Sequence, residues 1–157
     1  MDYRIIGIDY KNIYQDNESS RSINIKADIS DPKMVHKLIQ CYRPIEIYHL
    51  AAFHGSSEDD KNDFKNINKS MEVNFYSTLN ILNSIKKCSP KTKLFYASSS
   101  QIFGEQKSLV QDENTPFNPE NIYGITKHAA TKLCHYYRNK YSVFASVGIL
   151  YNHESPL

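Results

Sequence analysis

Short apolar runs alternate with longer helical patterns along the whole chain. In the helical segments apolar side chains recur every three to four positions, as Met71, Phe75 and Leu79 do. The predicted strands are residues 3–9, 22–27, 45–52, 92–97 and 142–151, and the predicted helices are residues 32–43, 64–87 and 122–141. Asp31 before Pro32 is a typical helix start. Strands alternating with helices predict an α/β fold with a doubly wound parallel sheet and helices on both faces.

Polar or small residues follow each predicted strand. Asp9 ends the first strand and Asp28 follows the second, while residues 50–52, 98–100 and Asn152 come at or after the ends of the other three. In an open parallel sheet, ligands bind beyond the carboxyl ends of the strands. The five strand ends together therefore predict a ligand site along one edge of the sheet.

Composition narrows the class of protein. The chain has 157 residues, of which 40% are hydrophobic and 23% charged, which suits one domain with its own core. A net charge of +2 without a basic block argues against nucleic acid, and no apolar run is long enough to span a membrane. The three separated cysteines are typical of reduced thiols, so we expect a cytoplasmic protein. His49 and His54 lack a third convergent ligand, so we expect no metal.

Three side chains suggest proton chemistry. Tyr123 and Lys127 are four residues apart, so on a helix they share one face. An ammonium group near a phenol favours the phenolate and is expected to lower the tyrosine pKa. Ser99, at the end of a predicted strand, can share a proton with that phenol. The three groups suit the removal of a proton from a carbinol while a hydride leaves its carbon.

With these residues in place, the chain resembles the extended short-chain dehydrogenase/reductases that act on nucleotide sugars, and most of all the GDP-mannose 4,6-dehydratases. The segments that carry the resemblance, in family order, are residues 28–29 (DI), 49–52 (HLAA), 73–79 (VNFYSTL), 97–104 (ASSSQIFG), 113–119 (ENTPFNP), 123–127 (YGITK) and 148–156 (GILYNHESP). The resemblance implies that residues 1–157 are an incomplete NAD(P)-binding, Rossmann-like domain, and that the substrate is a nucleotide sugar such as GDP-mannose.

The resemblance also implies roles for individual residues. Tyr123 would be the base, Ser99 would bind the sugar hydroxyl, and Lys127 would hold the nicotinamide ribose. The residues implied on the cofactor side are Asp9, Asp28, Ile29, Leu50, Ala51, Ala52, Lys127 and His153, and those implied on the substrate side are Ser99, Gln101 and Asn152. Asp9 suits the ribose 2′-hydroxyl of NAD better than the phosphate of NADP.

The chain departs from the family pattern in two places. Its five glycines, at positions 7, 55, 104, 124 and 148, form no glycine-rich phosphate turn, so the sequence starts at the equivalent of the family's second strand. We therefore expect the strands ending at Asp9, Ala52, Ala97 and Tyr151 to be neighbours, with an exposed edge where the first strand would insert. Gln101 stands where the dehydratases have a glutamate, and an amide can neither take nor return a proton near neutral pH.

Three interpretations follow from these features. The first is a fragment of a dehydratase, impaired or inactive alone. The second is a related epimerase or reductase, which needs no carboxylate at Gln101. The third is a non-catalytic remnant or interaction domain, with helix 64–87 as a possible surface for a homo-oligomer. Asn74 on that helix suits either a bond to backbone near the site or an ordinary satisfied interior position.

Overall fold

The computed structural model describes residues 3–11, 21–55, 63–105 and 110–152, and its strands are all parallel. The strands are β1 (Ile5–Asp9), β2 (Ser22–Lys26), β3 (Glu46–His49), β4 (Lys93–Ser99) and β5 (Ala145–Leu150). The helical elements are α1 (Pro32–Tyr42), α2 (Asp63–Ser70), η2 (Met71–Tyr76), α3 (Ser77–Cys88), η3 (Ser100–Ile102) and α4 (Ile122–Tyr141). Each predicted strand and helix is present within a few residues of its predicted bounds, and the α/β class with parallel strands is confirmed.

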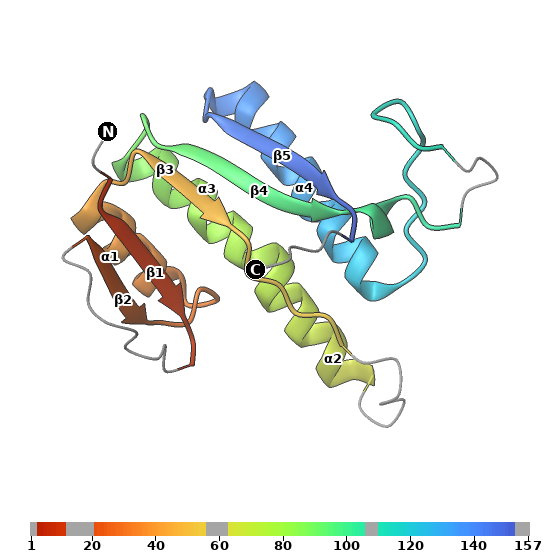
Figure 1. Cartoon of the computed structure of the whole chain (residues 1–157), viewed down its shortest axis with the longest axis horizontal. Helices are drawn as coiled ribbons and strands as arrows, with labels where there is room; N and C mark the ends of the chain where they lie inside the picture. The colour runs from red at the N-terminus through yellow and green to blue at the C-terminus, as the bar shows by residue number, and fades with distance from the viewer. Residues whose placement is uncertain (1–2, 12–20, 56–62, 106–109, 153–157) are drawn as a thin grey trace.

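The strands form two sheets rather than one. Among the described residues β1 pairs with β2 alone, and β3, β4 and β5 form a second sheet in that order (Figure 1). The expectation that the strands ending at Asp9, Ala52, Ala97 and Tyr151 are neighbours is therefore wrong for the first of them. The reason is the order of the strands: in a doubly wound sheet of this kind another strand lies between the equivalents of β1 and β3, and no strand among the described residues occupies that place.

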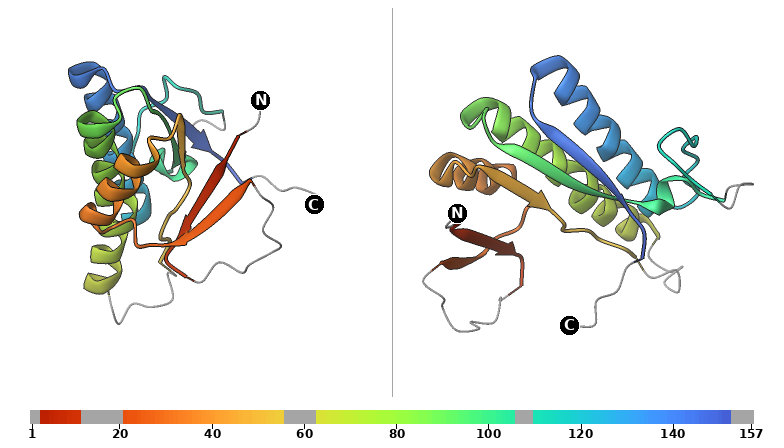
Figure 2. Two further views of the ribbon diagram at one scale, coloured as in Figure 1. Left: turned by 90° about the vertical axis from the view of Figure 1, so that its left-hand side faces the viewer. Right: turned by 45° about the horizontal axis from the view of Figure 1, so that its top comes forward.

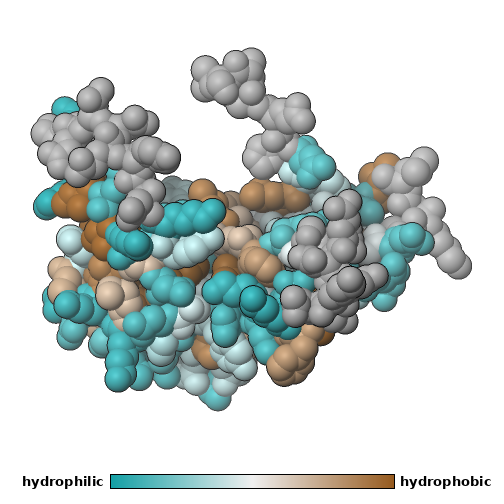
Figure 3. All heavy atoms as spheres, turned by 90° about the horizontal axis from the view of Figure 1, so that it is seen from below, coloured by the Kyte–Doolittle hydropathy of each residue, from teal (hydrophilic) through white to brown (hydrophobic). Residues whose placement is uncertain are grey.

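The helices cover one side of the strands. Seen edge-on, α1, α2, α3 and α4 all lie on the same side of both sheets (Figure 2). The expectation of helices on both faces is wrong for the residues that the structure describes. Large apolar side chains such as Ile5, Tyr48 and Leu50 remain exposed, and hydrophobic patches interrupt the polar surface in the view from below (Figure 3).

The core lies between the three-stranded sheet and its helices. Leu94 and Tyr96 of β4, Leu82 and Ile85 of α3, and Cys134 of α4 are fully buried there. α1 packs against α3 and places Val35 and Ile39 in the same cluster. Burying the apolar face of each helix stabilises this layer and holds α4 against β4 and β5.

The predicted helix 64–87 is confirmed, but it contains a segment that its periodicity does not reveal. Between α2 and α3 the six residues Met71–Tyr76 adopt π-helical geometry. π-helical segments are rare in proteins, and those that occur are often found at functional sites. The π-helix carries Asn74, which is fully buried. No helix among the described residues combines the length and apolar character needed to cross a membrane.

Candidate functional site

The end of β4 and the start of α4 bring Ser99, Tyr123 and Lys127 together. β4 ends at Ser99, and α4 begins after Asn121, whose side chain caps the helix by accepting from Gly124 N at 2.8 Å. Gly124 allows the close approach, because a Cβ there would lie 2.5 Å from the carbonyl oxygen of Gln101. Tyr123 and Lys127 therefore face the strand end from the first two turns of the helix.

A pocket of about 200 Å³ lies at this strand end. Its lining consists of Leu50, Ala52, Ala97, Ser98, Ser99, Tyr123, Lys127, Leu150, Tyr151 and Asn152. Six of the residues predicted for the site, from four different segments, thus border one cavity. Ala51, between two lining residues, does not line it. This convergence at the carboxyl edge of the sheet is where a parallel α/β fold places its ligand.

Ser99 is oriented toward the phenol of Tyr123. Its Oγ accepts from the backbone N of Gln101 at 3.3 Å, which leaves the hydroxyl hydrogen for another acceptor. The hydrogen bond between Ser99 and Tyr123 lowers the tyrosine pKa, but burial outweighs it and the pKa of Tyr123 is raised overall. The expectation that Lys127 lowers this pKa is wrong for this structure. Its Nζ lies 5.7 Å from the centre of the Tyr123 ring and donates instead to a backbone carbonyl.

Lys127 is a buried cation. Only 1% of its surface is exposed, and its Nζ donates to Ala97 O at 2.7 Å. Burial lowers the pKa of Lys127 to about 8, because removing an ammonium group from water disfavours its charged form. His49 lies near this charge, and burial followed by repulsion from Lys127 lowers its pKa to about 3. His49 is therefore neutral at physiological pH.

The tautomer of His49 follows from its partner. Ser77 Oγ donates to the carbonyl oxygen of Val73 and lies 2.8 Å from His49 Nε2. Since the hydroxyl hydrogen is already used, His49 Nε2 must carry the hydrogen and donate it to Ser77. His49 is thus a satisfied interior residue that joins β3 to α3.

Gln101 is held between two other side chains. Its Oε1 accepts from Asn121 Nδ2 at 3.0 Å, and its Nε2 lies 3.5 Å from His54 Nε2. The ring of His54 in turn packs edge-on against Tyr123, with 4.7 Å between the ring centres. Gln101 therefore lies beside the catalytic candidates, linked to them through an exposed imidazole.

Asn74 fastens the loop after β3 to this site. Its Oδ1 accepts from Phe53 N at 2.8 Å, and its Nδ2 donates to Phe53 O at 2.9 Å and to Thr126 Oγ1 at 3.1 Å. The first of its two interpretations, a bond to backbone near the site, is confirmed. The π-helix thereby fixes the residues that border the pocket on the β3 side.

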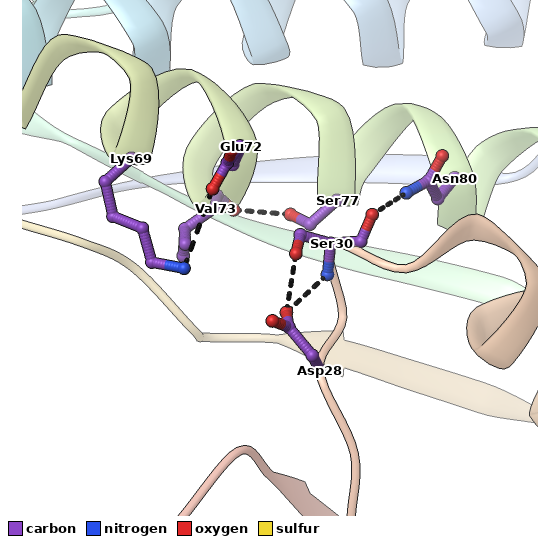
Figure 4. A network of polar contacts seen from close by, with 7 residues as sticks. All are labelled: Asp28, Ser30, Lys69, Glu72, Val73, Ser77 and Asn80. Atoms are coloured by element: carbon purple, nitrogen blue, oxygen red, sulfur yellow. Dashed lines mark hydrogen bonds and ion pairs between the residues drawn. The ribbon is translucent and has the colours of Figure 1, made fainter. Parts of the chain in front are cut away.

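Three other predicted cofactor residues, Asp9, Asp28 and Ile29, are not part of the pocket lining. Asp9 is at the end of β1, in the other sheet, and its Oδ1 accepts from Lys11 N at 2.7 Å. Asp28 accepts from the Oγ and N of Ser30, at 2.7 and 2.9 Å, and the hydroxyl bond is the main reason that its pKa is lowered (Figure 4). Ile29 packs on the core cluster. His153 lies outside the described residues.

The sequence interpretation missed two residues of this site. Asn121 immediately precedes an apolar periodic segment, which is the ordinary signal of a helix cap and could have been used. His54 was considered only as a metal ligand. Its position against Tyr123 depends on the path of the loop that Asn74 holds, for which the sequence carries no local signal.

Comparison with known proteins identifies relatives of this chain. The family described as GDP-mannose 4,6 dehydratase matches residues 8–157. GDP-mannose 4,6 dehydratase 2 of Caenorhabditis elegans is 37% identical over 131 residues, which are 82% of this chain and 33% of that protein. The human GDP-mannose 4,6 dehydratase is 33% identical over 149 residues, 94% of this chain and 39% of that protein. The chain thus spans less than two fifths of the length of these relatives.

Solved structures show the same fold. UDP-glucuronic acid 4-epimerase from Bacillus cereus, in complex with UDP-glucuronic acid and NAD, aligns with a TM-score of 0.76 at 27% identity, over 92% of this chain and 47% of that one. The dTDP-glucose 4,6-dehydratase from Bacillus anthracis, in complex with NAD, aligns with a TM-score of 0.79 at 20% identity, over 98% of this chain and 48% of that one.

Proposed function

Because the chain belongs to the GDP-mannose 4,6-dehydratase family, we propose that it carries the acid–base side chains for oxidation of the C4 hydroxyl of a nucleotide sugar. The observation that carries the proposal is the convergence of Ser99, Tyr123 and Lys127 on one pocket at the end of β4. Relatives named for GDP-mannose make that nucleotide sugar the first substrate to test.

Tyr123 is the proposed base. Its phenolate takes the proton of the sugar hydroxyl and becomes the phenol, and the Ser99 hydroxyl, which is hydrogen-bonded to Tyr123, binds the same sugar oxygen. Because burial raises the pKa of Tyr123 in the structure described here, the base needs further stabilisation of its phenolate when the site is loaded. The Lys127 ammonium group is the nearby candidate for that role.

The pocket also suits a nicotinamide cofactor, which when bound would accept the hydride from C4. One N–H of Lys127 is used by Ala97 O, and the others can donate to the hydroxyls of a ribose. Ala52 is a small pocket-lining residue that allows a flat ring to approach, and Leu50 beside it offers an apolar surface. Asp9 is the proposed partner of the adenosine ribose and favours NAD over NADP. Asn152, at the pocket rim, is the proposed contact on the sugar-nucleotide side.

Epimerisation at C4 is the second candidate. It needs the same oxidation but no elimination of water, and Gln101 is not the carboxylate that the dehydratases use. The similarity to a 4-epimerase structure at 27% identity favours this alternative as well. A homo-oligomer through helix 64–87 stays a prediction. The chain's own core takes up Ile81, Leu82 and Ile85 of that helix, whereas Phe64 and Tyr76 are exposed and open to a partner.

The test is product analysis of GDP-mannose with NAD or NADP. It uses the 157-residue chain and a chimera in which the first strand and glycine turn of a relative precede it and the relative's substrate portion follows it. We expect the chimera to form a C4-oxidised or C4-exchanged sugar, and Tyr123→Phe to lower that rate by about 10²–10⁴-fold. An unchanged rate in Tyr123→Phe would contradict the proposal, and the 4-epimer as sole product would select the second candidate.

A further inference from the structure

The side chains around Gln101 form a chain of hydrogen bonds with only one consistent direction. Asn121 Oδ1 accepts from the backbone N of Gly124, so its Nδ2 is the atom that donates to Gln101 Oε1. With its oxygen so used, Gln101 turns its Nε2 toward His54 Nε2, 3.5 Å away. An amide nitrogen carries hydrogens and has no lone pair to accept with. His54 Nε2 must therefore be the acceptor.

This direction determines the state of the imidazole. In this arrangement Nε2 of His54 holds the lone pair, so the ring hydrogen of this tautomer is on Nδ1. The hydrogen bond to Gln101 is long, so a reacting group can displace it at little cost. His54 also packs edge-on against Tyr123, with 4.7 Å between the ring centres, and is exposed. A free base is thus held beside the proposed oxidation site.

We propose, on the basis of the function proposed above, that His54 supplies the acid–base group that Gln101 lacks. Once C4 is a ketone, the adjacent C5–H bond is acidic, and His54 Nε2 takes that proton. The electron pair of the C5–H bond forms the C5–C6 double bond while the C6–O bond breaks. The imidazolium returns its proton to the departing hydroxide, which leaves as water, so the step needs no oxidant or reductant of its own.

The role of Gln101 in this proposal is to position His54. A glutamate at this position would accept from Nε2 and so place the hydrogen on the nitrogen that has to act as the base. The amide does the reverse and keeps that lone pair available. In this proposal the imidazole of residue 54 takes over as proton acceptor from the carboxylate that the family has at residue 101.

The first measurement reads the tautomer in the chain alone. The side-chain ¹⁵N shifts of the six histidines distinguish a protonated from a free ring nitrogen, and His54→Asn assigns the His54 signal. We expect a free Nε2 in the neutral form of the native chain and a protonated Nε2 in Gln101→Glu. A protonated Nε2 in the native chain overturns the proposal.

The second measurement reads proton transfer at C5 without hydride transfer. The chimera described above, which carries the native His54 and Gln101, is given GDP-4-keto-6-deoxymannose in D₂O without NAD, and deuterium entering C5 is followed by mass spectrometry. We expect exchange to be about 10²–10⁴-fold slower in His54→Asn and unchanged in the matched control His36→Asn, on α1. Native exchange no faster than that of His54→Asn overturns the proposal. Because this exchange needs no cofactor, its failure is distinct from a failure of C4 oxidation.

Discussion

Replacing Lys127 by methionine should make the protein more stable in a way that depends on pH. The side chain is 1% exposed and its ammonium group has lost almost all contact with water. Burial lowers its pKa from 10.5 to about 8, so the native state holds the charge less readily than the unfolded chain does. Methionine fills a similar volume without a charge, and loses only the bond to Ala97 O.

Proton linkage gives the sign and the size of this change in the free energy of unfolding with pH. Below pH 8 both states are protonated, and the native state carries a cost of about 3 kcal/mol for the buried charge, at 1.36 kcal/mol per tenfold change. Between pH 8 and 10.5 the native state releases the proton first, so the unfolded state binds more protons and the free energy of unfolding rises with pH. The cost falls by about 2 kcal/mol between pH 7 and pH 9.5.

The assay is urea unfolding of native chain and Lys127→Met at both pH values, followed by circular dichroism. The stability advantage of Lys127→Met over the native chain should shrink by about 2 kcal/mol at the higher pH. The bond to Ala97 O contributes at both pH values and largely cancels. Lys132→Met, an exposed lysine on the same helix, should show no such change. An advantage of Lys127→Met that is equal at both pH values would refute the assignment of Lys127 as a destabilising buried cation.

Three other predictions concern binding and stability. The sequence has no glycine-rich turn whose backbone amides would bind the pyrophosphate of NAD, and two or three such hydrogen bonds are worth about 1.5–3 kcal/mol each. Residues 1–157 alone should therefore bind NAD with a dissociation constant no better than about millimolar, and a low-micromolar dissociation constant in calorimetry would contradict this. Asn74→Leu should cost about 2–4 kcal/mol of unfolding free energy, because it strands both backbone groups of Phe53, whereas Asn80→Leu, which loses one bond, should cost less than half as much. Gly104→Ala should lower the free energy of unfolding by at least about 1–2 kcal/mol in the same urea assay, since φ is +63° and a Cβ would lie 1.9 Å from Asn118 O. Equal stability of Gly104→Ala and the control Gly55→Ala would be evidence against that strain.

Local patterns in the sequence were sufficient for the elements and for part of the site. Periodicity alone placed the helix 122–141, and Asp31 before Pro32 marked the start of α1. The four-residue spacing of Tyr123 and Lys127 and the position of Ser99 at a strand end are also local, and they were enough to predict that the three meet. Such features depend on backbone propensity and helix geometry, which nearest neighbours determine.

The tertiary structure decided the features that depend on partners distant in the chain. The separation of β1 and β2 from the other sheet depends on which strand edges can reach each other. The pKa of Lys127 depends on how completely β4 and α4 exclude water, which no spacing reveals. Which atom donates in the hydrogen bond between Gln101 and His54 depends on Asn121, and both partners of His54 are distant from it in the sequence. Charge state and proton position are set by burial and by the last partner in a hydrogen-bond chain, and both exist only once the chain has folded.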